Sequence, residues 1–276
     1  MAVTILFVML AFSKQMEKSM ESMEIQNMAL KLDRAAQNRI AVKQFSIDQK
    51  ISLDEAYKIQ EKLIARREER NQPITGIKMG FTSFAKMEQM GVHDMIWGRL
   101  TRDMEILKGE TVSLNEYIHP RAEPEICFRV AKTIDKEISI DDAKSHYVDA
   151  VCGAIEIIDS RYENFKFSLE DVIADNCSSA GYALGSWHHI DKDIKDLDIK
   201  LYFDEEVVAS GSSNDILGNP WLSVVHASRL CSHYGFIITE GSILLAGAAT
   251  NAIFLKSGTK VRAEIQGFDD IGFQVV

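Results

Sequence analysis

Residues 119–128 read His-Pro-Arg-Ala-Glu-Pro-Glu-Ile-Cys-Phe and place two carboxylates two positions apart. Side chains two apart on a strand point to the same face, so we expect Glu123 and Glu125 to lie side by side. Two such charges repel unless a cation lies between them or one carboxylate takes a proton. A hard divalent ion such as Mg²⁺ suits the pair, because it takes oxygen ligands and keeps waters that a substrate can displace. The alternative is a solvated Glu-x-Glu pair on an edge strand, since charges usually lie at surfaces.

A third carboxylate, Glu156, lies within the strand-like run Ala154-Ile155-Glu156-Ile157-Ile158-Asp159. Strand alternation places Glu156 on the face opposite Ile155 and Ile157. A charge in such a run is costly unless it is paired or bound to a metal. A strand with one wet face would explain the same pattern.

Lys78 lies between two glycines in Gly76-Ile77-Lys78-Met79-Gly80. Glycines in a strand permit close approach by a ligand. The lysine could then hold a substrate carboxylate as a point charge. A strand lysine that faces water is the alternative.

Two further clusters of small or polar residues are candidates for substrate contact. The first, Asp175-Asn176-Cys177-Ser178-Ser179, has donors that could bind a carboxylate, although turn chemistry is the commoner reason for such a run. The second, Gly247-Ala248-Ala249-Thr250, could leave room for a ligand or allow tight packing.

Composition narrows the function classes. The net charge is −10, from 31 basic and 41 acidic residues without a basic block, which argues against nucleic acid as a main partner. The four cysteines form no Cys-x-x-Cys pair, so we expect reduced thiols in a cytoplasmic protein and no zinc site. The apolar run 2–12 is too short to span a membrane and lacks the flanks of a signal peptide. We interpret it as an arm covered by a partner or as an unusual leader.

The pattern predicts helices followed by one β-rich body. Residues 14–43 have helical periodicity, and a second helix begins with a capping box at Ser52 and Glu55. Another helix follows Asn219-Pro220, and a short one is expected over 143–150. Short strands at close spacing favour a curled, mostly antiparallel or mixed sheet assembly. The strands are expected at 77–79, 125–131, 151–158, 180–184, 199–203, 207–210, 243–246 and 260–265.

Longer runs around these residues resemble the 4-oxalocrotonate (2-oxo-3-hexenedioate) decarboxylases. These enzymes belong with the 2-hydroxypentadienoate hydratases in the fumarylacetoacetase-like superfamily. The resemblance covers about residues 25 to 275, whereas residues 1–24 resemble nothing in that family. Its motifs are the runs 76–83 and 85–92, 119–125, 156–167, 174–179, 217–220 and 241–250.

The resemblance implies a fold, a metal site and a set of contacts. The fold is α+β, a mixed β-roll of fumarylacetoacetase C-terminal type with an N-terminal helical region. We expect an atypical extension over 1–24, a helical region over 25–75 and a catalytic domain over 76–276. The implied metal ligands are Glu123, Glu125 and Glu156, with Mg²⁺ or Mn²⁺ as the ion. The implied catalytic residue is Lys78, and the implied substrate contacts are Lys78, Ser178, Ser179 and Thr250.

One position separates the two activities of this group. Hydratases carry an acid directly before the aromatic-glycine pair, whereas Ile96 precedes Trp97-Gly98 here. The resemblance therefore implies decarboxylation of 2-oxohex-3-enedioate to 2-hydroxypenta-2,4-dienoate in the meta-cleavage catabolism of aromatic compounds. Asp94 lies near the expected acid, so a shifted loop would restore hydratase chemistry. Departures from the decarboxylase pattern occur at Arg121, where lysine is common, at Cys177, where alanine is common, and at Ala246 and Ala248, which flank Gly247.

Two alternatives stay open at this point. One is hydration of 2-hydroxypenta-2,4-dienoate, which would require a proton relay and a water. The other is a non-catalytic subunit that stabilises a hydratase partner. The family also implies a complex with that hydratase and a homo-oligomer.

Overall fold

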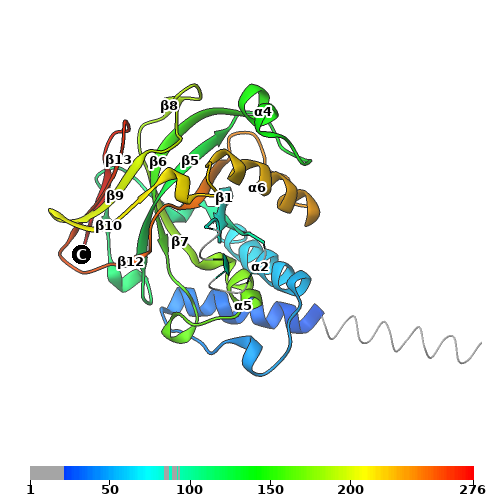
Figure 1. The fold of residues 1–276 in the computed structure, drawn as a ribbon. Coiled ribbons are helices and arrows are strands. Elements are labelled where there is room, and N and C mark those ends of the chain that lie inside the picture. The colour runs from blue at the N-terminus through cyan, green and yellow to red at the C-terminus, as the bar shows by residue number, and fades with distance from the viewer. Residues whose placement is uncertain (1–21, 84–86, 89–91, 93) are drawn as a thin grey trace, which may run out of the picture.

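The computed structural model describes residues 22–83, 87–88, 92 and 94–276, which form two curled β-sheets with helices packed against them (Figure 1). The apolar run 2–12 and most of the 1–24 extension lie outside the described residues. Within the described part of the chain, no helix is both long enough and apolar enough to cross a membrane.

The N-terminal region is helical, as predicted. A helix covers residues 22–38, and α2 (Leu53–Glu68) follows it. The predicted capping box is present, because the Ser52 side chain accepts a hydrogen bond from the Glu55 amide and the Glu55 side chain accepts one from the Ser52 amide. Helix α2 packs against the short helix α5 (Leu169–Ala174).

The larger sheet holds nine strands and is mixed. Its order is β2-β1-β11-β5-β6-β7-β3, with β12 paired to β5 and β8 paired to β6. Strand β1 runs parallel to β11. Along the order β11-β5-β6-β7, each strand is antiparallel to the next. The bounds are β1 (Ile74–Gly80), β2 (Ile96–Thr101), β3 (Glu105–Ile106), β5 (Arg121–Val130), β6 (Val148–Ile158), β7 (Ser179–Leu184), β8 (His188–His189), β11 (Ile243–Ala248) and β12 (Ile253–Phe254).

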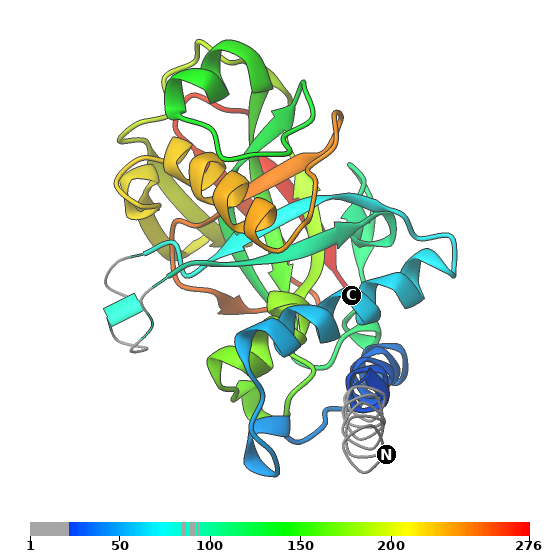
Figure 2. The same cartoon turned by 90° about the vertical axis from the view of Figure 1, so that its right-hand side faces the viewer.

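The second sheet has five strands in the order β10-β9-β13-β14-β4. Helices α6 and α2 cover the same face of the larger sheet, and strands β1 and β2 pass between them (Figure 2). The bounds are β4 (Thr111–Val112), β9 (Asp198–Phe203), β10 (Glu206–Ser212), β13 (Lys260–Ile265), β14 (Ile271–Val275) and α6 (Trp221–His233).

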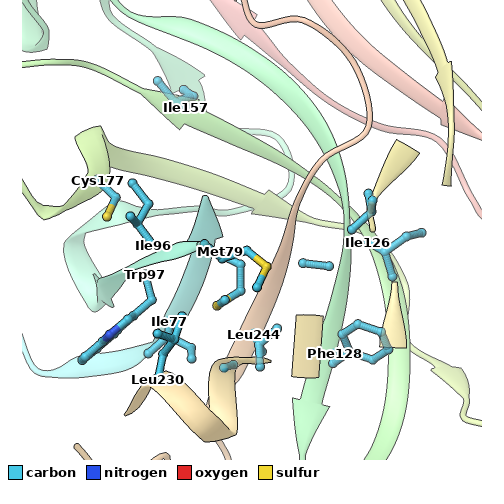
Figure 3. Packing of buried hydrophobic residues seen from close by; sticks show 14 of the residues in the cluster. Ile77, Met79, Ile96, Trp97, Ile126, Phe128, Ile157, Cys177, Leu230 and Leu244 are labelled. Carbon is cyan, nitrogen blue, oxygen red and sulfur yellow. The ribbon is translucent and has the colours of Figure 1, made fainter. Parts of the chain in front are cut away.

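One part of the core fills the space between the larger sheet and α6, and the rest extends to the N-terminal helices and the second sheet. Figure 3 shows Ile77 and Met79 of β1 near Leu244 of β11, with Leu230 of α6 against Ile77. All of these side chains are buried. Burying a side chain of this size contributes about 1.5–3 kcal/mol, so the core fixes β1 and β11 beside β5.

The expected curled mixed sheet is confirmed, and each predicted strand falls within or overlaps an observed one. The short helix expected over 143–150 is present but is displaced towards the N-terminus. The structure has α4 (Ile140–Asp142), then a π-helical turn over Ala143–Tyr147, and β6 begins at Val148. Val148 already pairs with Val130 of β5, so sheet pairing outweighs local helix propensity there.

Candidate metal centre

The three glutamates come from the two central strands of the larger sheet. Glu123 of β5 lies directly opposite Glu156 of β6, and Glu125 follows one row further along the same face. Strand β5 is flanked by β11 and β6, so the alternative of a solvated edge strand does not apply. Glu123 is 8% exposed, and Glu125 and Glu156 are fully buried. The sheet thus collects three carboxylates at one buried point.

These carboxylates are close enough to share one ion. One carboxylate oxygen from each of the three lies within 4.8 Å of the others. Oε1 of Glu125 and Oε1 of Glu156 are buried without a hydrogen-bond partner among the described residues. Burying unpaired carboxylate oxygens is costly. A hard divalent cation with oxygen ligands would remove that cost, so the donor set fits Mg²⁺ or Mn²⁺.

The pKa values of the cluster reflect the same cost of burying its carboxylates. Burial, reinforced by Glu156 and Glu123, raises the pKa of Glu125 well above its ordinary value. Burial also raises the pKa of Glu156 to about 7, although Lys78 opposes the rise. Protonation is the way to relieve this repulsion in the metal-free protein.

Lys78 of β1 points into the same cluster rather than to water. Its side chain is 5% exposed, and its Nζ lies 2.9 Å from Oε2 of Glu156. Nζ also donates a hydrogen bond of 3.3 Å to the carbonyl oxygen of Cys177. Burial alone would lower the pKa of Lys78, but the glutamates, Glu156 foremost, raise it above its ordinary value. Lys78 is therefore a buried ammonium that partly balances the three acids.

Gly247 of β11 brings a backbone donor to the cluster. Its N–H donates a 2.8 Å hydrogen bond to Oε2 of Glu125, at a register shift between Leu245 and Ala248. Its φ is +103°, and a Cβ there would lie 2.0 Å from Oγ1 of Thr82. Only glycine fits such a position. Glycine at position 247 thus allows the backbone of β11 to come close to Glu125 and Thr82.

The turn at Asn176-Cys177-Ser178 lies against Lys78 and has an unusual backbone. All three residues have positive φ, at 51°, 53° and 59°. Such conformations are costly outside glycine and persist only where the surroundings enforce them. Here the side-chain amide of Asn176 makes two hydrogen bonds to the backbone of Arg99. Its Oδ1 accepts from the Arg99 N–H at 2.7 Å, and its Nδ2 donates to the Arg99 carbonyl oxygen at 2.8 Å.

A buried ion pair supports this turn from behind. Arg161 pairs with Asp175, and both side chains are buried. Nη1 of Arg161 also donates to the carbonyl oxygens of Asp159 at 2.7 Å and Ser179 at 3.0 Å. Sequence reasoning missed this network and the glycine contact, because neither leaves a local pattern.

A cavity of about 140 Å³ opens beside the cluster. Its polar lining includes Lys78, Glu123 and Ser178. Ser179 and Thr250 do not line it. Oγ of Ser179 is buried at the start of β7, and the Thr250 hydroxyl donates to the Asn251 carbonyl at 3.1 Å. The apolar lining includes Met79, Phe81, Ile96, Ile158, Phe165, Phe167 and Val172.

The candidate acid of a hydratase does not reach this cavity. Asp94 forms an ion pair with Arg229 of α6 at 2.6 Å, and its side chain is 49% exposed. Ile96 lines the cavity instead. Parts of the motif over 85–92, together with His93, lie outside the described residues.

Fold and site together define the class of protein. Residues 100–276 match the fumarylacetoacetate hydrolase C-terminal family, and the chain belongs to that family. Within it, the chain is similar to a 4-oxalocrotonate decarboxylase from a Pseudomonas species, with 46% identity over 91% of this chain and 98% of the relative. A 2-keto-4-pentenoate hydratase from Paraburkholderia xenovorans is 30% identical over 80% of this chain and 83% of its own length.

A solved structure agrees with this placement. The 4-oxalocrotonate decarboxylase from Pseudomonas putida G7, complexed with magnesium and adipate, superposes with a TM-score of 0.89. The two sequences are 30% identical, and the superposition covers 92% of this chain and 98% of that enzyme's chain. A second structure of that enzyme, complexed with calcium and acetate, has a TM-score of 0.88.

Proposed function

We propose that this chain decarboxylates 2-oxohex-3-enedioate to 2-hydroxypenta-2,4-dienoate with Mg²⁺ or Mn²⁺ as cofactor, as a carboxy-lyase of meta-cleavage catabolism. The observation that carries the proposal is the convergence of Glu123, Glu125 and Glu156 beside a cavity that Ile96 lines where a hydratase has an acid. The similarity to 4-oxalocrotonate decarboxylases at 46% identity supports the same activity.

Glu123, Glu125 and Glu156 would hold the metal. When bound, the ion supplies a Lewis acid that polarises the 2-oxo group of the substrate. The chain's own contribution begins with geometry, because strands β5 and β6 hold the three ligands in register before any ion binds. The Gly247 amide fixes the orientation of Glu125 through its hydrogen bond.

Lys78 is the proposed catalytic residue. An ammonium carries three donors, and two of them are used by Glu156 and the Cys177 carbonyl. Because Lys78 also lines the cavity, a third donor is available to a substrate oxygen. Cleavage of the C5–C6 bond sends its electron pair through the C3=C4 bond to the 2-oxo oxygen. A charged donor beside that oxygen stabilises the developing negative charge.

Of the four expected substrate contacts, the two that line the cavity, Lys78 and Ser178, are the ones proposed to touch the substrate. The Ser178 hydroxyl lines the cavity and has no hydrogen-bond partner among the residues that the structure describes, so a substrate oxygen would satisfy it. Ser179 and Thr250 lie outside the cavity lining and would act by supporting the walls around it.

Hydration is the less favoured activity. Decarboxylation needs no strong base, which fits a cavity with Ile96 at that position. Hydration would need an acid and a water, and the nearby Asp94 is engaged by Arg229. A purely non-catalytic role would leave the buried carboxylate cluster without a purpose.

We also propose that the chain is cytoplasmic, that it associates with copies of itself and that it forms a complex with a 2-hydroxypentadienoate hydratase. The product of the proposed reaction is the substrate of such a hydratase. The division into an extension over 1–24, a helical region over 25–75 and a catalytic domain over 76–276 belongs to the same proposal.

The test supplies 2-oxohex-3-enedioate with Mg²⁺ to the purified full chain and follows CO₂. We expect CO₂ release that stops when a strong chelator removes the metal and returns when Mg²⁺ is restored. A parallel assay supplies 2-hydroxypenta-2,4-dienoate and looks for 4-hydroxy-2-oxopentanoate. Formation of that product without CO₂ release from the first substrate would replace the proposal with hydratase activity.

A further inference from the structure

We propose that Arg121 binds the distal carboxylate of the substrate and thereby makes the site selective for 2-oxo dicarboxylates over 2-oxo monocarboxylates. The inference rests on the proposed function, because it takes the glutamate cluster as the anchor for the 2-oxo acid end. It adds a specificity-determining residue at the other end of the substrate.

Arg121 lies on the same face of β5 as two of the three glutamates. Glu125, Glu123 and Arg121 alternate along one face of β5. Across the strand pair, Glu123 lies opposite Glu156, and Arg121 lies opposite Ile158. Residues two apart on a strand are separated by about 7 Å, which is also roughly the span of a six-carbon diacid. Arg121 therefore lies about one substrate length from the glutamates.

The cavity reaches this third row. Ile158, the cross-strand neighbour of Arg121, lines the cavity together with Glu123 of the second row. Phe165 also lines the cavity, and the Arg121 guanidinium lies 4.1 Å from the centre of its ring. Arg121 itself is not one of the residues that line the cavity, and its guanidinium adjoins the part of the wall that Phe165 forms.

Two aromatic rings contact the Arg121 guanidinium. Its carbon lies 4.1 Å from the Phe165 ring centre and 4.0 Å from the Phe254 ring centre. Cation–π contacts with these two rings hold the group in place, and the edge of the guanidinium carries its N–H donors. Such an edge matches a carboxylate, which accepts two parallel hydrogen bonds from it.

Two ring or guanidinium nitrogens at this end have no hydrogen-bond partner in the described ranges of the chain. Nε of Arg121 is buried without a hydrogen-bond partner, and within the described part of the chain no carboxylate forms an ion pair with Arg121. Nε2 of His119 is likewise buried without a partner, and its ring lies 5.1 Å from the Phe165 ring. The buried N–H of Arg121 requires an acceptor. A substrate carboxylate supplies it.

The reaction fixes the sign of the kinetic effect. The distal carboxylate leaves as neutral CO₂ when the C5–C6 bond breaks, so its interaction with Arg121 is stronger before the transition state than in it. An interaction of this kind lowers KM and does not raise kcat. It also releases the product, because 2-hydroxypenta-2,4-dienoate no longer carries the group that Arg121 binds.

The first experiment measures binding by calorimetry in the presence of Mg²⁺, without turnover. The probes are 2-oxohexanedioate and 2-oxohexanoate, which share the 2-oxo acid end and differ only in the distal carboxylate. We expect the full-length wild-type chain to prefer the diacid by about ten-fold or more. Arg121→Leu loses that preference, and Arg121→Lys retains part of it. The matched control is Arg129→Leu on the same face of β5, where Arg129 is paired with Asp149.

The second experiment measures kcat and KM for CO₂ release from 2-oxohex-3-enedioate. Arg121→Leu raises KM by about ten-fold, with kcat unchanged or higher. Wild-type turnover with an unchanged diacid preference in Arg121→Leu overturns the inference and leaves the proposed function intact. A wild-type chain that releases no CO₂ overturns the proposed function itself, whatever the binding data show.

A milder variant guards against misfolding at Arg121. Phe254 is 50% exposed and only clamps the guanidinium, so Phe254→Leu should fold normally. Loss of one stacking contact should reduce the diacid preference by about two- to five-fold. A full preference in Phe254→Leu, together with an unchanged KM, contradicts the clamp.

Discussion

Two buried ionic clusters, one on the strands of the larger sheet and one formed by residues that follow β6 and α5, differ in how completely their charges are paired. In the scaffold cluster, Arg161 meets the Asp175 carboxylate and three backbone carbonyls. In the metal cluster, one ammonium, Lys78, faces three carboxylates. The scaffold cluster is complete without a ligand, whereas the metal cluster has an excess of negative charge. The excess marks the functional site, because a protein gains nothing in stability from unpaired buried charge.

The largest expected effect comes from removing one metal ligand. Glu125→Gln should lower kcat for CO₂ release by about a thousand-fold or more, because the substrate loses its Lewis acid. The same substitution should raise the melting temperature of the metal-free protein, since it removes one of three repelling charges. Steady-state kinetics and calorimetry without and with chelator check both outcomes.

A lower melting temperature of metal-free Glu125→Gln would contradict the view that this carboxylate is a cost in the absence of an ion. The matched control is Asp149→Asn, which removes an exposed carboxylate and should change neither quantity appreciably.

The scaffold cluster should respond in the opposite way. Asp175→Asn leaves Arg161 buried with an uncompensated charge and should lower the free energy of unfolding by about 3–5 kcal/mol. Denaturant unfolding of the metal-free protein measures this loss. Equal stability of Asp175→Asn and wild type would remove the distinction between the two clusters.

A smaller effect is expected at the glycine that contacts Glu125. Gly247→Ala places a methyl group against Thr82 in a backbone region unsuited to alanine, so it should cost about 2–3 kcal/mol. It should also weaken Mg²⁺ binding, since the amide that orients Glu125 shifts. Gly218→Ala is the control: its φ is also positive, at 72°, but a Cβ there meets nothing within 4 Å. We expect a loss of about 1 kcal/mol at that site and normal metal binding.

The smallest expected effect is a pH dependence of metal binding. The pKa of Glu156 is about 7 in the metal-free fold and lies above its value in the unfolded chain. Protonated Glu156 therefore stabilises the metal-free fold at low pH, and that contribution is lost as the pH rises toward 7. Mg²⁺ must displace the proton, so its affinity should fall about ten-fold per pH unit below 7. Calorimetric Mg²⁺ titrations from pH 6 to 8.5 test this, and a flat profile would contradict it.

Local sequence arguments predicted part of the glutamate cluster, and the resemblance to the decarboxylases was needed to bring Glu156 to the other two. Glu123 and Glu125 share a face by their spacing, and Glu156 stands out among β-branched residues. Lys78 could be singled out from its flanking glycines, but its ion pair with Glu156 could not, since β1 and β6 are not neighbours in the sheet. Their proximity follows from sheet curvature.

Other features left no usable local signal. Strand β2 was missed because all six of its residues are buried, so no alternation is visible. Strand β14 does alternate and could have been found by the same test. The left-handed turn at Asn176 depends on hydrogen bonds to Arg99, a contact between distant segments that no spacing predicts.

The most direct test of the account is a Mn²⁺ titration followed by electron paramagnetic resonance. We expect one bound ion per wild-type chain and loss of that site in Glu123→Gln, Glu125→Gln and Glu156→Gln. Arg129→Leu should bind the ion normally. One tightly bound Mn²⁺ in all three glutamate variants would show that these carboxylates do not form the metal centre.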